Sequence, residues 1–151
     1  MERLLLAAHV VAGILFVGPV AVTTSLFPRY APLAGRLGGA ADGDGRSASV
    51  AAVLHRVTRL YGALALAVPL IGLVLAAVQG RLTEVWITLA MVLTAVAGGV
   101  LVLRITPIQR EALRTPDDGA RLRVLRGLAG VFNLLWTTVV VLMVVRPGAE
   151  S

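Results

Sequence analysis

Four long apolar runs constrain this chain more than any other feature of its sequence. They cover residues 4–27, 61–78, 83–103 and 127–145. A helix rises about 1.5 Å per residue, so each run is long enough to cross a hydrocarbon layer roughly 30 Å thick. Of the 151 residues 58% are hydrophobic and 15% are charged, whereas soluble domains usually carry about 25% charged residues. The bilayer is therefore the expected solvent for most of this surface.

The runs predict an all-α membrane protein, an antiparallel four-helix transmembrane bundle that forms one domain over residues 1–151. We expect Pro28 to close the first helix, and Pro69 to kink the second without ending it. Arg104 and Pro107 are expected to lead into a polar connection, and residues 115–119 form a strong turn signal. The predicted helices cover residues 4–27, 50–78, 83–104 and 120–145, with a flexible Gly- and Asp-containing loop over 31–48 that Ser47 or Ser49 ends by capping the second helix.

Arginine placement predicts the orientation. Eleven of the 14 basic residues, all of them arginine, border the first and third connections. By the positive-inside rule, loops 28–49 and 105–120 are cytoplasmic and both termini lie outside. The absence of Lys and the abundance of Ala, Gly, Val and Leu indicate a GC-rich bacterial genome, and hence the bacterial cytoplasmic (inner) membrane. Because the arginines flank apolar runs, the net charge of +6 is expected to face lipid headgroups and not nucleic acid.

His9 is the residue most indicative of a site, because a polar side chain inside an apolar run is costly. Its imidazole is a candidate ligand for haem b or copper. The alternative is a histidine bonded to a neighbouring helix or to water. His55 is not expected to share one metal with His9, because each lies near the start of its own helix and consecutive helices run in opposite directions. The two are then separated by about 20 Å or more.

Two further groups of residues are candidates for binding or packing. Four arginines form i, i+3 pairs and can bind an anionic lipid or a phosphate, or only set the topology. A second group is expected to pack helices together or to form a subunit contact, since membrane helices associate through small residues and interhelical hydrogen bonds. The first group is Arg56, Arg59, Arg123 and Arg126; the second is Asn133, Trp136, Gly98 and Gly99.

No catalytic residue is predicted. Apart from Glu84 at the mouth of the third run, the apolar runs contain no Asp, Glu or Lys, and the chain has no cysteine, no Ser-His-Asp set and no Gly-rich phosphate loop. Proton-coupled export needs a titratable carboxylate in the membrane, so this inventory excludes that class. An enzyme built from these residues would take its chemistry from a cofactor.

The first helix carries a resemblance to a known group. The stretch His9-Val-Val-Ala-Gly-Ile-Leu-Phe-Val-Gly18 resembles the opening helix of bacterial predicted integral membrane proteins of unknown function, which are distantly similar to the copper-resistance D family. Pro19 replaces the second glycine of their usual Gly-Gly. Trp86 and the closing Met143-Val-Val-Arg146-Pro147 also fit. The resemblance implies His9 as a copper ligand, although Met91 and Met143 are far apart in sequence, which counts against a copper pathway.

Three functions are therefore expected, in this order. The first is a non-enzymatic structural or accessory subunit that self-associates or joins a larger membrane complex. The second is a haem- or copper-binding redox or transport protein that uses His9. The third is a small-solute or lipid transporter that works without an intramembrane carboxylate and uses the arginine cluster.

Overall fold

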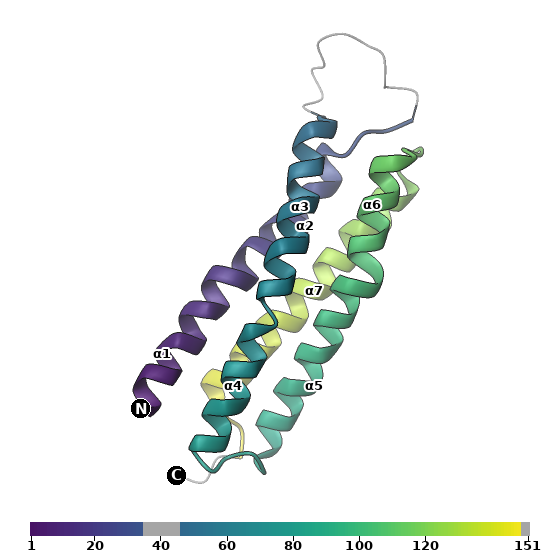
Figure 1. Cartoon of the computed structure of the whole chain (residues 1–151). Coiled ribbons are helices and arrows are strands. Elements are labelled where there is room, and N and C mark those ends of the chain that lie inside the picture. Colours follow the sequence, from purple (N-terminus) through teal and green to yellow (C-terminus); the bar gives the residue numbers. More distant parts are fainter. Residues whose placement is uncertain (35–45, 149–151) are drawn as a thin grey trace.

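The computed structural model of the chain describes residues 1–34 and 46–148, and every regular element within these ranges is helical. The helices join into four long spans, Glu2–Tyr30, Ala48–Val78, Val85–Arg114 and Ala120–Val145 (Figure 1), which confirm the predicted all-α four-helix fold. The segments are α1 (Glu2–Ala12), η1 (Gly13–Val17), α2 (Gly18–Tyr30), α3 (Ala48–Leu64), α4 (Ala67–Val78), α5 (Val85–Val100), η2 (Leu101–Ile105), α6 (Thr106–Arg114) and α7 (Ala120–Val145).

The surface of the four spans is suited to lipid. The most apolar window of each span has a mean hydropathy of 2.3, yet only 17–22% of each window is buried inside the protein. The remaining apolar side chains need a non-aqueous environment, because removing each Å² of apolar surface from water is worth about 25 cal/mol. The composition of the spans thus matches a membrane protein.

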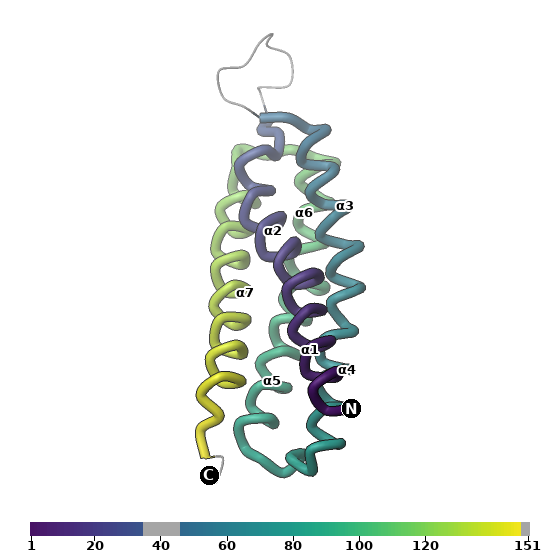
Figure 2. Tube along the Cα trace, turned by 90° about the vertical axis from the view of Figure 1, so that its left-hand side faces the viewer, coloured from purple at the N-terminus to yellow at the C-terminus, as the bar shows by residue number. Residues whose placement is uncertain are grey.

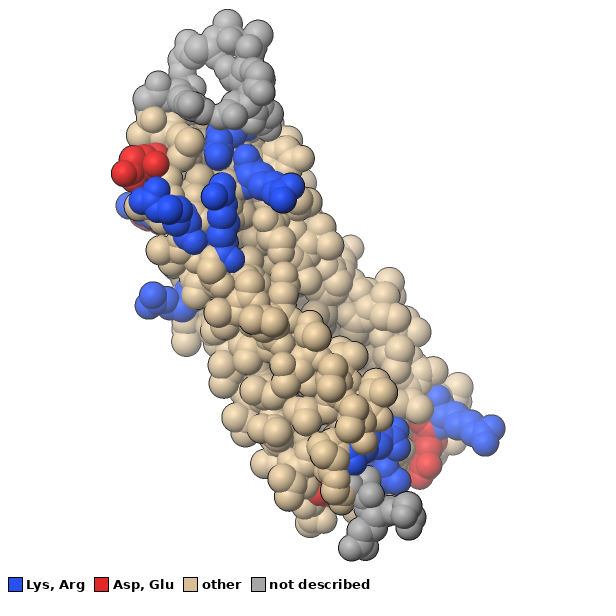
Figure 3. Space-filling model, turned by 180° about the vertical axis from the view of Figure 1, so that it is seen from behind, with Lys and Arg blue, Asp and Glu red and all other residues tan. Residues whose placement is uncertain are grey.

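Consecutive spans run in alternating directions, so each end of the bundle has its own connections (Figures 1 and 2). One end, here called the termini end, holds Met1, the turn between α4 and α5, and the end of α7. The other, here called the arginine-rich end, holds the connections from α2 to α3 and from α6 to α7. In Figure 3 the charged atoms gather toward these two ends, with an uncharged band between them.

Three of the four prolines inside the spans, all except Pro28, follow a helix distortion four residues earlier. Pro19 follows the wide turn η1, Pro107 follows the wide turn η2, and Pro69 follows the break between α3 and α4 at residues 65–66. A proline ring clashes with the carbonyl of residue i−4 in a regular helix and donates no hydrogen bond to it. A wide turn or a break moves that carbonyl away, so the helix continues past the proline.

Two predicted helix ends were wrong. The first helix extends through Pro28 to Tyr30 and does not stop at residue 27. The third continues through Pro107 to Arg114 and does not stop at residue 104. At η2 the carbonyl of Leu101 accepts hydrogen bonds from both the backbone N–H and the side-chain hydroxyl of Thr106, the latter at 2.9 Å.

The two connections at the arginine-rich end are tied to each other and to the helices. The backbone N–H of Ser47 donates to the carbonyl of Tyr30 (2.9 Å), and that of Ala34 donates to the carbonyl of Asp117 (2.8 Å). Ser47 also accepts a hydrogen bond from the N–H of Val50, so it caps α3 as predicted. Most of the predicted flexible loop lies outside the described residues.

Asp117 organises the start of α7. Its carboxylate accepts hydrogen bonds from the backbone N–H groups of Gly119 (2.9 Å) and Arg121 (3.1 Å), and the Arg121 guanidinium lies 3.9 Å away. Desolvation alone raises the pKa of Asp117, but these donors and the guanidinium outweigh it and hold the pKa below its ordinary value. Gly119 has a φ of +97°, which a side chain would strain, so the predicted turn between α6 and α7 is confirmed with its glycine required.

Packing is densest toward the arginine-rich end, where Phe27, Ile105 and Leu125 are almost completely buried. Toward the termini end the spans separate into pairs: α1 packs against α4, and α5 packs against α7. Space therefore remains between the two pairs, and it is there that the candidate site lies.

Candidate functional site

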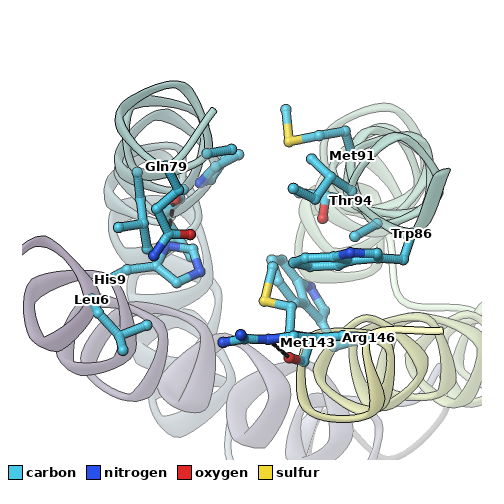
Figure 4. A pocket seen from close by; sticks show the side chains of 16 residues that line it. Leu6, His9, Gln79, Trp86, Met91, Thr94, Met143 and Arg146 are labelled. Carbon is cyan, nitrogen blue, oxygen red and sulfur yellow. Dashed lines mark hydrogen bonds between the residues drawn. The ribbon is translucent and has the colours of Figure 1, made fainter. Parts of the chain in front are cut away.

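A small cavity lies between α1, α4, α5 and α7 near the termini end. Its volume is about 100 Å³, and its walls include His9, Trp86, Met91, Trp136, Met143 and Arg146. Figure 4 shows His9 on one side, beside α4, with Met91 and Met143 on the α5 and α7 side. We call this space the inner cavity. It contains the residue that the sequence singled out as a ligand.

His9 is held firmly against α4. Its side chain is 8% exposed, and its Nδ1 lies 3.0 Å from the carbonyl oxygen of Val68. A carbonyl only accepts hydrogen bonds, so Nδ1 carries the proton and Nε2 keeps a free lone pair. Gly72 makes this position available, because an added Cβ there would lie 2.8 Å from Cε1 of the imidazole. The alternative in which His9 bonds to a neighbouring helix is thus correct, but it involves only one ring nitrogen and leaves the other for a ligand.

Met91 and Met143 are far apart in sequence, and this separation was taken to count against copper. In the folded chain, however, both residues line the inner cavity together with His9. Met91 lies on α5 and Met143 on α7, and these two helices pack against each other. One histidine and two methionines therefore line the same small volume.

Aromatic and charged side chains form the rest of the cavity wall. The guanidinium of Arg146 lies over the ring of Trp86, 6.0 Å from its centroid, and its Nε donates to the carbonyl of Met143 (3.3 Å). The indole N–H of Trp86 donates to the carboxylate of Glu84, which also pairs with Arg81 at 3.5 Å. These contacts hold Arg146 beside the cavity and occupy Glu84 with partners of its own.

Asn133 and Trp136 have partners inside this chain. The amide of Asn133 donates to the hydroxyl of Ser25 on α2 (3.1 Å). Trp136 lines the inner cavity and meets Phe132 edge to face, with ring centroids 6.3 Å apart. Its buried indole N–H has no partner among the described residues. The helix-packing role predicted for these residues fits such contacts, whereas a subunit contact stays a prediction.

Gly98 and Gly99 do not bring two helices of this chain together. A Cβ added to either would meet no atom within 4 Å. The glycines in close contact are Gly72, beside His9, and Gly62, where a Cβ would lie 3.0 Å from the Leu101 side chain. Packing of Gly98 and Gly99 against another subunit stays a prediction.

A second and larger hollow lies on the side of the bundle, between α3–α4 and α5–η2–α6. Its volume is about 810 Å³, its walls are mostly apolar, and its arginine-rich end carries Arg59 and Arg110. We call it the lateral groove. It meets the inner cavity at Pro69, Met91 and Thr94, which line both.

The four arginines predicted to bind an anion do not form one site. Arg59 lines the lateral groove, whereas Arg56, Arg123 and Arg126 are exposed and line none of the described hollows. The other arginine that lines the lateral groove is Arg110 of α6. The sequence did not single it out, because the third helix was predicted to end before it.

His55 lies away from His9, as the sequence predicts. Its Nδ1 is 3.0 Å from Oε1 of Gln109 on α6, whereas His9 bonds α4 near the opposite end. Gln109 is fully buried, and its amide nitrogen has no partner among the described residues. The pair is therefore a structural contact between α3 and α6.

Within residues 1–34 and 46–148, no three His, Cys, Asp or Glu side chains form a group that could hold a metal ion. A site in the inner cavity must therefore use the thioethers. Haem b does not fit, because cofactor pockets start at about 300 Å³ and the inner cavity has about 100 Å³. No protein-family model, curated protein or solved structure matches this chain, so the resemblance to proteins near the copper-resistance D family stays a prediction.

Proposed function

We propose that this chain is a non-enzymatic membrane protein that binds one cuprous ion in the inner cavity. The ligands are Nε2 of His9 and the thioether sulfurs of Met91 and Met143. The proposal rests on one observation: these three donors, from three different spans, border the same cavity of about 100 Å³.

The donor set favours Cu(I) over other metals. Thioethers are soft ligands and select Cu(I), whereas Zn²⁺ sites use thiolate, imidazole or carboxylate ligands. No Asp, Glu or Cys is among the described residues that line the cavity, and Arg146 brings a positive charge to it. Neutral ligands beside a guanidinium tolerate a single positive charge better than a double one, because Coulomb repulsion scales with the product of the charges.

The surroundings of His9 prepare it for this role. The Val68 carbonyl fixes the proton on Nδ1, and Gly72 lets the ring approach α4 closely. Such hydrogen bonds to a ligating histidine fix its tautomer and orientation, and their loss typically costs about 10- to 100-fold in metal affinity. The chain thus supplies a ligand that needs little rearrangement.

A titration of the purified protein in detergent with Cu(I), under reducing anaerobic conditions and against a chromogenic chelator, tests the proposal. We expect one ion per chain. His9→Ala and Met143→Leu should each weaken binding by about 100-fold or more, since they remove ligands. His55→Gln is the matched control and should bind normally. Equal binding by the His9 and His55 variants would refute the site.

The proposal includes the orientation expected from the arginines, with both termini outside the bacterial cytoplasmic membrane. The inner cavity would then lie toward the outer face, since it is near the termini end. A reporter fused after residue 40 should be cytoplasmic and one at the C-terminus should be external. The reverse result would place copper binding on the cytoplasmic side.

A further inference from the structure

The lateral groove differs from the inner cavity in size, position and charge. It has about 810 Å³, within the range of about 300–1,000 Å³ typical of ligand pockets. Its walls are mostly aliphatic, and Leu66, Leu70 and Leu73 of the second span are part of them. All three are more than 40% exposed, so the groove opens to the side of the bundle where acyl chains lie.

The charges of the groove are gathered at one end. Arg59 of α3 and Arg110 of α6 line it at the arginine-rich end, and neither guanidinium has a hydrogen-bond or ion-pair partner among the described residues. The rest of the groove is lined by aliphatic residues, methionine, threonine, proline and glycine. An occupant must therefore be negative at one end and apolar along its length.

The length of the groove gives its orientation in the bilayer. Along the second span its lining runs from Arg59 to Leu73, which is about 21 Å of helix at 1.5 Å per residue. One leaflet contributes about half of a hydrocarbon core roughly 30 Å thick. A phospholipid of the leaflet at the arginine-rich end would thus place its headgroup beside the two arginines and one acyl chain along the groove.

We propose that the lateral groove binds one anionic phospholipid of the leaflet at the arginine-rich end. Arg59 and Arg110 receive the headgroup, and the groove between α3–α4 and α5–η2 receives an acyl chain. The break between α3 and α4, required by Pro69, and the open face at Gly98 together provide room for the chain. The lipid site adjoins the copper site at Met91, which lines both hollows, but its two arginines lie away from the inner cavity.

Native mass spectrometry of the detergent-purified protein with added phosphatidylglycerol or phosphatidylcholine tests this inference. We expect one phosphatidylglycerol per chain, bound in preference to phosphatidylcholine. The Arg59→Gln/Arg110→Gln variant should bind it about 30-fold more weakly, since each arginine near the membrane surface contributes about fivefold in attraction to anionic lipid. The control Arg123→Gln/Arg126→Gln has the same net charge and changes arginines outside the groove, so its affinity should stay within about threefold.

A second pair of variants tests the acyl-chain part. Gly98→Leu places a side chain in the groove, at a position where nothing lies within 4 Å of an added Cβ. Gly99→Leu adds the same side chain at the adjacent position, which is equally open but does not line the groove. We expect only the first to reduce lipid binding. Inorganic phosphate in excess should not displace the lipid, and displacement would reduce the site to an anion site. Equal losses in both arginine variants would overturn the proposal, as would a dimer that Gly98→Leu dissociates without lipid loss.

Discussion

Replacing Gly72 with alanine tests how His9 is positioned. The added Cβ would lie 2.8 Å from Cε1 of the imidazole, which is closer than real Cβ contacts, and 3.2 Å from Nδ1, which is tighter than most of them. The ring must therefore move away from α4, and the hydrogen bond to the Val68 carbonyl must lengthen or break. The inner cavity of about 100 Å³ lies beside the ring and can receive it.

The destabilisation expected from the Gly72→Ala clash has a lower and an upper bound. If the ring swings freely into the cavity, the loss is that of one hydrogen bond, about 1 kcal/mol. If neighbouring side chains resist, the cost rises toward the range for overpacking, about 1–3 kcal/mol. Alanine also favours the helix over glycine by up to about 1 kcal/mol. The change in unfolding free energy of Gly72→Ala alone is thus ambiguous. The cost of the clash with His9 has to be separated from the gain in helix propensity.

A double-mutant cycle that combines Gly72→Ala with His9→Ala isolates the cost of the clash. Without the imidazole the three nearest contacts of the new methyl group are gone, while the helix-propensity gain is the same in both backgrounds. Unfolding in mixed detergent and SDS micelles should give a coupling free energy of about 1–3 kcal/mol. Gly99→Ala, which meets nothing within 4 Å, is the control and should show no coupling. If Gly72→Ala had the same effect with and without His9, the described packing of the ring would be refuted.

Three further predictions concern other contacts. Asp117 has a lowered pKa in the folded state, so its contribution to stability is present above the unfolded pKa of about 3.9 and is lost as pH falls through the folded value. Amide exchange of Gly119 should therefore accelerate over that acid range, and Asp117→Asn should abolish this pH dependence. Ser25→Ala removes the partner of Asn133 and should cost about 0.6 kcal/mol of unfolding free energy in micelles without changing the mass of the particle by light scattering. His55→Ala leaves the buried Gln109 amide without its hydrogen bond and should cost about 1–3 kcal/mol in the same unfolding assay, whereas a change below 0.3 kcal/mol would contradict that burial.

The sequence predicts the spans well because their signal is simple. A hydrophobic run of sufficient length in a bilayer must be helical, since every backbone group needs a partner within the segment. The ends of the helices were harder to predict, because Pro28 and Pro107 were read as terminators. The wide turn η2 lets the third helix pass Pro107, and this moves Arg110 from a supposed loop onto a helix that lines the groove.

The candidate site was half predictable. His9 stands out in a sequence because a polar residue inside an apolar run is rare. Met91 and Met143 do not, because methionine is ordinary in an apolar helix and the packing of α5 against α7 is a property of the whole bundle. Gly72 and Ala76 have the spacing of a small-residue pair, but the atoms nearest to Gly72 belong to the ring of His9 and not to the backbone of another helix.

X-ray absorption at the copper edge, on protein loaded with one equivalent of Cu(I) in detergent, tests the central claim most directly. The account predicts both nitrogen and sulfur neighbours of the ion, and loss of the sulfur signal in the Met91→Leu/Met143→Leu variant. Only nitrogen and oxygen neighbours in the unaltered protein, or an unchanged sulfur signal in the variant, would contradict it.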